Sequence, residues 1–175
     1  MKKILIGLLL AQASFANEGP TFILSSPSFD DGATLPLKQV SNSGECKGKN
    51  SSPALEWTDG PNGTQGYAVT VFDPDMESGS GWWHWTLFNI PKDVTSLREA
   101  MTVIPKGSVQ GRTDGGKFKF EGPCHTSKGK PHRYIFTVYA LKVPSIPLKS
   151  DASGAMVGYY IHQNMIAKSS ITASF

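Results

Sequence analysis

The sequence predicts a mainly β protein with one late helix, an α+β fold in a single domain. Three observations lead to this prediction. The chain has 175 residues, which is enough for one domain with a substantial core. Its 18 Gly and 12 Pro indicate many turns. Three segments rich in β-branched and aromatic residues come before the one segment that carries a helix-start signal, and this order favours an antiparallel sheet.

The three predicted strands are bounded by turn-forming residues. The first, Tyr67–Phe72, is apolar on both faces, as is typical of a central strand, and Asp73-Pro74 ends it because proline lacks the N–H that a strand ladder needs. A Gly/Ser-rich turn leads to the second strand, Trp83–Ile90, which stops before a proline. The third strand is Tyr134–Leu141.

A helix is predicted late in the chain. Ser153 can cap a helix that runs from about Gly154 to Lys168. Apolar residues spread nearly all round this helix, so we expect it to be largely buried. A short strand, Ile171–Phe175, is expected to close the chain.

The first sixteen residues have the three parts of a secretory signal peptide. Lys2 and Lys3 form a charged start, the apolar run that follows is too short to span a bilayer, and Ser14-Phe15-Ala16 is a small-x-small cleavage site. The alternative is a buried first strand or helix. We expect cleavage after Ala16, a single domain over 17–175, and export to the periplasm or beyond the cell. No later stretch approaches the length of a transmembrane segment.

Removal of the signal peptide also bears on the partners of the protein. Loss of Lys2 and Lys3 lowers the formal net charge from +3 by two, to +1. Net charge of that size would not steer the protein to nucleic acid, and none is expected as a partner. The sequence leaves the oligomeric state open, a homodimer included.

Two cysteines, Cys46 and Cys124, are present. In an oxidising compartment an isolated pair is more typical of a disulfide than of a metal site or a catalytic thiol. The alternative is two free buried thiols.

Acidic and imidazole side chains stand at the ends of the predicted strands. Asp73 and Asp75 follow the first strand, His84 enters the second and His132 enters the third. If the first two strands pair antiparallel, Asp73 and His84 come to the same end of the sheet, where binding residues commonly gather. If the third strand also enters at that end, His132 joins them, a topology that spacing alone does not establish. Each also has a structural interpretation, because Asp-Pro opens turns, and a histidine between tryptophans can simply be packed against their rings.

Several motifs, in this order, resemble the signature blocks of the phosphatidylethanolamine-binding protein (PEBP, Raf-kinase-inhibitor-like) family. They are Asp73-Pro74-Asp75, Gly81-Trp82-Trp83-His84-Trp85, Gly122-Pro123 and His132-Arg133-Tyr134. Flanking segments agree over almost the whole chain after the signal peptide, and Ser153 to Gly158 is similar to the bacterial branch.

The resemblance implies a central antiparallel sheet with a smaller sheet packed against it, and a shallow anion pocket at one end. The pocket residues that it implies are Asp73, Asp75, His84, Gly122, Pro123, His132 and Tyr134. Two departures from the family pattern stand out. Met76-Glu77 replaces a segment that usually contains a proline, and Cys124 follows Pro123 where many relatives carry a second proline.

These residues suggest how an anion could be held. Two aspartates would repel it, unless Asp73 accepts a hydrogen bond from His84 or His132 and thereby favours a protonated imidazole. That imidazolium, backbone N–H groups near Gly122 and the Tyr134 hydroxyl could then bind a phosphate oxygen.

The predicted function is therefore binding of a small anion or phosphate ester, such as a phospholipid headgroup. The resemblance adds modulation of an unidentified protein partner, in the manner of a kinase or protease inhibitor. No Gly-x-Ser-x-Gly nucleophile motif is present, and the spacing of histidines and acids is a weak case for zinc. No catalytic residue, cofactor or metal ligand is assigned. The alternative is a weak hydrolase or a metal-binding protein that uses the Asp/His pocket.

Overall fold

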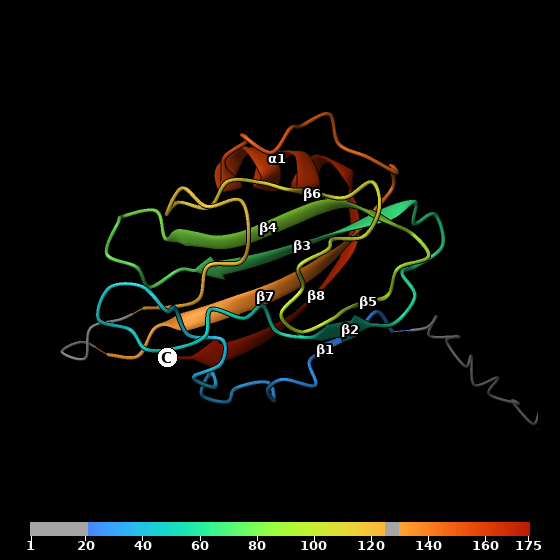
Figure 1. Cartoon of the computed structure of the whole chain (residues 1–175). Helices are drawn as coiled ribbons and strands as arrows, with labels where there is room; N and C mark the ends of the chain where they lie inside the picture. Colours follow the sequence, from blue (N-terminus) through green and yellow to red (C-terminus); the bar gives the residue numbers. More distant parts are fainter. Residues whose placement is uncertain (1–20, 125–129) are drawn as a thin grey trace, which may run out of the picture.

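A computed structural model describes residues 21–124 and 130–175 of the protein (Figure 1). The predicted signal peptide, residues 1–16, lies outside these described residues. Among them, no helix is both long and apolar enough to cross a membrane. The elements are β1 (Leu24–Ser25), β2 (Leu55–Trp57), β3 (Gly66–Asp73), β4 (Trp82–Pro91), β5 (Ser96–Leu97), β6 (Val109–Gln110), β7 (Arg133–Leu141), α1 (Gly154–Asn164) and β8 (Met165–Ser174).

Two antiparallel sheets form the scaffold, which confirms the predicted fold class. The large sheet has the strand order β6-β4-β3-β7-β8, and the small sheet has the order β1-β2-β5. Figure 1 shows the small sheet beside the lower strands of the large sheet and α1 beside its upper strands. Strand β3 is the middle strand of the large sheet, as its apolar sequence predicted.

The alternation of side chains along the strands produces one hydrophobic core on each face of the large sheet. On β3, Tyr67, Val69 and Val71 point into the core that the small sheet covers. Ala68, between the first two, belongs to the other core, together with Val157 and Ile161 of α1. The large sheet is therefore buried on both faces.

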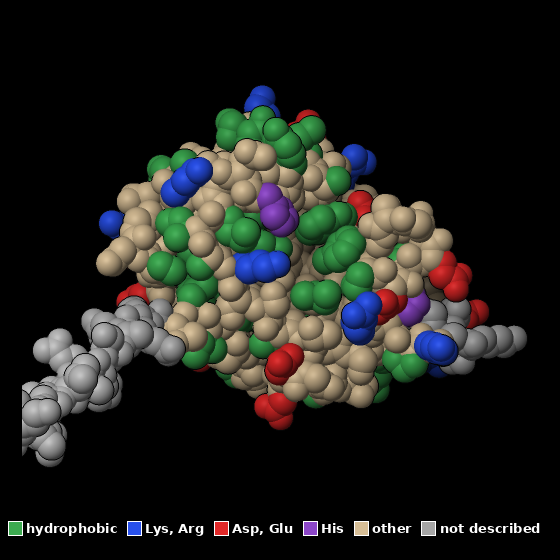
Figure 2. All heavy atoms as spheres, turned by 180° about the vertical axis from the view of Figure 1, so that it is seen from behind, with side chains coloured by type: hydrophobic (Ala, Val, Ile, Leu, Met, Phe, Trp, Pro, Cys, Tyr) green, Lys and Arg blue, Asp and Glu red, His purple; other side chains and the backbone are tan. Residues whose placement is uncertain are grey.

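Helix α1 differs from the prediction in its end and in its burial. It ends at Asn164 rather than near Lys168, and the next residue, Met165, already has extended backbone angles. Only Gly154, Val157, Gly158 and Ile161 of the helix are buried. The expectation of a largely buried helix is therefore wrong, because the helix covers the sheet with one narrow face and leaves Tyr159 60% exposed. On the side opposite to that of Figure 1, hydrophobic side chains form separate patches interspersed with polar and charged groups (Figure 2).

The last strand is longer than predicted. β8 runs over Met165–Ser174 instead of Ile171–Phe175, and it pairs with β7 along almost its full length, from Leu141↔Met165 to Arg133↔Ser174. Residues 165–168 contain apolar side chains that suit a helix, but pairing with β7 gives their backbone groups ladder partners instead. Tertiary pairing thus overrides the local pattern.

Strand β4 contains a bulge at His84. Val71 of β3 pairs with Trp85 and the next residue, Phe72, pairs with Trp83, so His84 is the extra residue on β4. As a result Trp83 packs against the glycines of α1, while Trp85 lies in the core on the opposite face of the sheet. Strict alternation would have placed both tryptophans on the same face.

Candidate functional site

Three strands, β3, β4 and β7, begin or end at the same end of the large sheet, which confirms the predicted clustering. β3 leaves this end at Asp73, which pairs with Trp82, the first residue of β4. β7 enters at the same end, where Ile135 pairs with Phe72. The loops that follow β3 and precede β4 and β7 therefore share one end of the sheet (Figure 1).

A cavity of about 270 Å³ lies at this end. Three of the seven predicted pocket residues, His84, Gly122 and Tyr134, line it, whereas Asp73, Asp75, Pro123 and His132 do not. The other lining residues are Ser41, Ser43, Gly44, Met76, Trp82, Glu121 and Cys124.

His84 lines the cavity and has one ring nitrogen without a hydrogen-bond partner among the described residues. The residue is 4% exposed, and its Nδ1 lies 2.8 Å from the carbonyl oxygen of Glu121. Because a carbonyl can only accept, Nδ1 carries a proton. The other nitrogen, Nε2, is buried and has no hydrogen-bond partner among the described residues. A buried polar atom without a partner carries a free-energy cost that a bound ligand or water would remove.

Burial lowers the pKa of His84 below its usual value. The Glu121 carbonyl and the negative charge of Asp73 oppose this shift but do not cancel it. The sequence-based expectation of a favoured imidazolium is therefore wrong for His84 in the unliganded protein. Neutral His84, with its proton on Nδ1, offers a lone pair at Nε2.

Asp73 is fully buried and organises the site from behind. Its Oδ2 accepts a hydrogen bond of 2.8 Å from Nδ1 of His132. Its Oδ1 accepts from the backbone N–H groups of Asp75 and Met76, at 2.8 and 3.1 Å. The predicted bond from a histidine to Asp73 is confirmed for His132, and it fixes the His132 tautomer with a proton on Nδ1.

Asp75 forms a partly exposed ion pair with Arg133. Its carboxylate receives Nε and Nη2 of Arg133, at 2.8 and 2.7 Å, and the backbone N–H of the same residue at 2.9 Å. The side-chain hydrogen bonds from Arg133 lower the pKa of Asp75 to about 2, against the opposing effect of burial. This pairing neutralises the aspartate that would otherwise repel an anion.

Tyr134 packs its ring edge-on against that of His84, with ring centres 5.2 Å apart. Burial raises the pKa of the Tyr134 hydroxyl well above its usual value, and the negative charge of Asp73 adds to the effect. The hydroxyl therefore stays protonated and can donate a hydrogen bond to a ligand.

Gly122 contributes space rather than a donor. Its own N–H is already donated to Oδ1 of Asn50 at 2.7 Å, so it is not one of the backbone donors expected near this residue. A side chain at this position would place Cβ 2.1 Å from the carbonyl oxygen of Gln39. Only glycine fits here, because the chain 39–41 passes directly against it.

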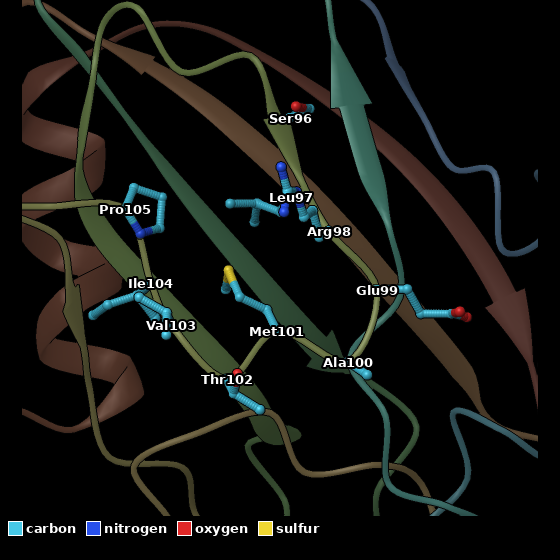
Figure 3. A pocket seen from close by; sticks show the side chains of 10 residues that line it. All are labelled: Ser96, Leu97, Arg98, Glu99, Ala100, Met101, Thr102, Val103, Ile104 and Pro105. Carbon is cyan, nitrogen blue, oxygen red and sulfur yellow. The ribbon is translucent and has the colours of Figure 1, made fainter.

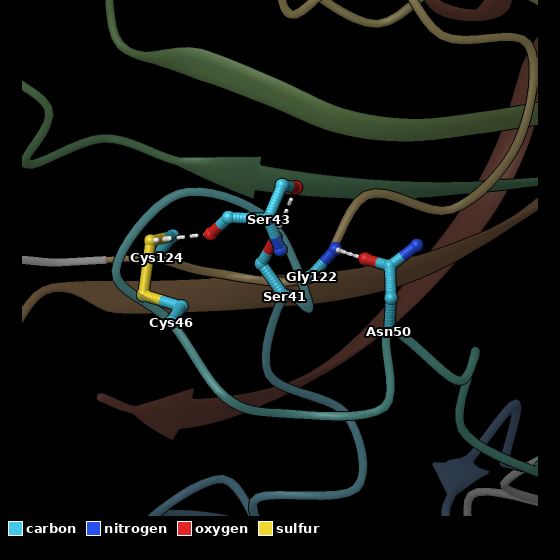
Figure 4. The surroundings of a disulfide bond; sticks show 6 residues. All are labelled: Ser41, Ser43, Cys46, Asn50, Gly122 and Cys124. Carbon is cyan, nitrogen blue, oxygen red and sulfur yellow. Dashed lines mark hydrogen bonds between the residues drawn. A yellow bond between two sulfur atoms is a disulfide. The ribbon is translucent and has the colours of Figure 1, made fainter.

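A disulfide between Cys46 and Cys124 confirms the predicted pairing (Figure 4). It connects the 41–50 loop with the segment after β6, and both segments line the cavity. Two hydrogen bonds support the same contact, from Ser41 N–H to the Pro123 carbonyl and from Gly122 N–H to Asn50.

Sequence reasoning missed the wall that Ser41, Ser43 and Gly44 form, and it missed Glu121. The signal for the wall was present, because a Cys46–Cys124 bond must bring residues near 46 beside Gly122-Pro123. Glu121 had no such signal. Its role depends on the bulge at His84, which lets the imidazole reach the Glu121 carbonyl.

A larger cavity, of about 530 Å³, lies away from the strand ends (Figure 3). Residues 96–105 alone line it, and Figure 3 shows Glu99 pointing away from it. This carboxylate instead accepts hydrogen bonds from Lys38, Gln39 and Ser28. Size alone therefore does not mark the chemically equipped site. No group of three or more His, Cys, Asp or Glu side chains suited to a metal occurs in the described parts of the chain.

Comparisons with known proteins agree over most of the sequence. The profile of the family described as "Phosphatidylethanolamine-binding protein" matches residues 25–175. The UPF0098 protein YbcL of Escherichia coli K12 is 44% identical over 177 residues, which cover 98% of this chain and 97% of YbcL. In Mycobacterium tuberculosis, LppC, whose name describes it as a lipoprotein, is 31% identical over 87% of this chain and 71% of its own length.

Solved structures share the fold. The crystal structure of E. coli YbcL, described as a new member of the mammalian PEBP family, superimposes with a TM-score of 0.86 at 45% identity, covering 88% of this chain and 97% of that chain. The structure of the PEBP homologue CT736 of Chlamydia trachomatis gives a TM-score of 0.75 at 25% identity, covering 88% and 96%.

Proposed function

Because the chain belongs to the phosphatidylethanolamine-binding protein family, we propose that the His84 cavity binds a small anion, with phosphate esters such as a phospholipid headgroup as the preferred class. The observation that carries this proposal is the buried, unpartnered Nε2 of His84 at the wall of a cavity. Next to it, the hydroxyl of Tyr134 is a second group that can donate to a ligand oxygen.

Which anions can bind depends on whether the ligand oxygen or Nε2 of His84 carries the proton of the hydrogen bond between them. Neutral His84 accepts at Nε2, so a ligand oxygen can bond to it only if that oxygen, or Nε2 itself, carries a proton. A monoprotonated phosphate ester brings its own proton, whereas a sulfate does not and can bond to Nε2 only when His84 is protonated to an imidazolium. The buried charge of Asp73 nearby also disfavours ligands with two full negative charges.

We propose that the protein binds rather than catalyses, and that it is exported and can modulate a protein partner. The charged and apolar start of the chain, the disulfide and the lipoprotein name of a mycobacterial relative support export. The side-chain hydroxyls among the described lining residues belong to Ser41, Ser43 and Tyr134, and the hydrogen bond recorded for the His84 ring goes to the Glu121 carbonyl instead. Sustained turnover of phosphate or carboxylate esters, lost in His84→Ala, would favour the hydrolase alternative instead.

Affinity for a sulfate is expected to rise as pH falls, and to keep rising below the pH at which an ordinary imidazole becomes protonated. The complex holds one proton more than the free protein, so binding strengthens as pH drops until free His84 is itself protonated. That point lies below its ordinary imidazole value, since burial lowers the pKa of His84. A phosphate monoester, which carries its own proton below a pKa near 6, should reach its highest affinity at a higher pH. Titration calorimetry with both ligands from pH 5 to 8 measures this difference.

The His84→Ala variant is the matched test of this assignment. It should weaken phosphate-ester binding by about 1.5–3 kcal/mol, the range for a hydrogen bond to a charged group. His162→Ala, on the exposed side of α1, serves as the control and should bind as the wild type does. Unchanged affinity in His84→Ala would place the anion site elsewhere.

The protein recovered from an exporting host is expected to begin at Asn17, because the charged start, the short apolar run and Ser14-Phe15-Ala16 agree on one cleavage site. Intact mass spectrometry measures this directly. A mass that still includes residues 1–16 would contradict export by this route.

A further inference from the structure

A second hollow, of about 510 Å³, lies beside the His84 cavity and shares none of its lining residues. Three segments surround it, at 49–52, 100–102 and 118–120, and Trp85 and Gln110 complete the lining. Asn50 separates the two cavities, since its side chain bonds to the Phe120 carbonyl and to the Gly122 N–H. We call this second cavity the lysine hollow, after Lys49 and Lys119.

The charge of the lysine hollow is positive. Lys49 and Lys119 line it, and no acidic residue does. Neither lysine forms an ion pair with any residue in 21–124 or 130–175. By contrast, Lys38 nearby is paired with Glu99. Two unpaired ammonium groups around a concave surface favour an anionic ligand.

Two polar side chains of the lysine hollow, Gln110 and Ser52, can donate hydrogen bonds to a ligand. Gln110 accepts the Trp85 indole N–H at its Oε1, at 2.8 Å, so its amide N–H groups remain available. The Ser52 hydroxyl oxygen accepts the N–H of Met101, which leaves its own proton for another acceptor. These donors lie near the lysines and add directional contacts to their charge.

Another cavity of mixed polar and apolar lining adjoins the hollow. It is the 530 Å³ cavity of residues 96–105, and the two cavities share Ala100, Met101 and Thr102. The side chains of Leu97, Met101 and Pro105 point into this space (Figure 3). On the other rim of the lysine hollow, Phe118 is 52% exposed. The lysine hollow therefore continues into a cavity that offers apolar side chains together with the polar or charged Ser96, Arg98 and Thr102.

We propose that the lysine hollow and the adjoining cavity together form a second ligand site, which binds an amphipathic anion. The acidic head of the ligand, a carboxylate or a sulfonate, lies between Lys49 and Lys119. Its aliphatic or aromatic body lies against Met101 and Leu97. This site is independent of the His84 cavity and takes a different class of ligand, in which apolar contact contributes much of the affinity.

The test uses decanoate and anilinonaphthalene sulfonate as the aliphatic and aromatic ligands, with inorganic phosphate as a head without a body. Affinities are measured by calorimetry, and the position of binding is mapped by amide chemical shifts. We expect the shifts to move at 49–52, 100–102 and 118–120. The double variant Lys49→Ala, Lys119→Ala should weaken decanoate binding about tenfold or more. The control double variant Lys142→Ala, Lys168→Ala removes the same charge from residues that do not line the hollow, and it should leave decanoate binding unchanged.

Two further variants separate the head from the body. Met101→Gln should weaken decanoate and the aromatic sulfonate while leaving the protein folded. Neither Lys49→Ala with Lys119→Ala nor Met101→Gln should change phosphate binding in the His84 cavity, which also verifies that each variant is folded. Equal decanoate affinity in the lysine double variant, or shift changes confined to other segments, would overturn the proposal. Binding of inorganic phosphate alone to the hollow would also overturn it, because the apolar part would then play no role.

Discussion

Replacing Asp73 with alanine is expected to lower the free energy of unfolding by several kcal/mol, about 1–3 kcal/mol for each buried hydrogen-bond donor that loses its acceptor. The carboxylate is fully buried and accepts hydrogen bonds from His132 Nδ1 and from the backbone N–H groups of Asp75 and Met76. Alanine leaves all three donors without an acceptor inside the protein. Urea denaturation followed by circular dichroism gives the change.

Two matched variants show which part of Asp73 matters. Asp73→Asn keeps the shape, and its amide oxygen can still accept from the Asp75 N–H. Its NH₂ group, however, faces His132 and requires the other His132 tautomer, with Nδ1 as the acceptor. We therefore expect a loss of stability that is smaller than in Asp73→Ala. Asp75→Ala removes the partly exposed pair with Arg133 and should cost within about 1 kcal/mol. Equal losses in Asp73→Ala and Asp75→Ala would contradict the organising role of the buried carboxylate.

Removal of the disulfide is expected to lower the free energy of unfolding by up to about 4–4.5 kcal/mol. This follows from the chain-entropy model for a closed loop with a sequence separation of 78 residues. The figure is an upper one, because the bonds from Ser41 to Pro123 and from Asn50 to Gly122 still connect the same segments. The variant is Cys46→Ser with Cys124→Ser, measured by urea denaturation.

The same variant should bind phosphate esters more weakly than the wild type. Ser41, Ser43 and Gly44 on one side of the bond, and Gly122 on the other, line the His84 cavity, and releasing them adds an ordering cost to binding. Wild-type protein in a reductant is the control and should behave as the double serine variant does. Two freely alkylated thiols in the untreated exported protein would show that the cysteines are unpaired in solution.

The sequence by itself determined the strands of the large sheet that position the site. Tyr67–Phe72, Trp83–Ile90 and Tyr134–Leu141 were predicted within one or two residues of β3, β4 and β7. Each combines β-branched and aromatic residues with a clear end, and the burial that such segments require left little choice of structure. That Asp73 and His84 share one end of the sheet followed from antiparallel pairing of the first two strands, whereas the place of His132 depends on the pairing of β3 with β7, which the structure supplies.

Only the tertiary structure decided which hydrogen-bond and ion-pair partners those residues have. Asp73 and Asp75 look alike in the sequence, yet one is buried behind His132 and the other forms a partly exposed ion pair with Arg133. The bulge at His84, the use of the Gly122 N–H by Asn50 and the strand at 165–168 all depend on partners distant in sequence. Local patterns report propensity and burial, whereas hydrogen-bond partners are chosen by whichever groups the folded chain brings within about 3 Å, and that choice also sets the pKa of His84.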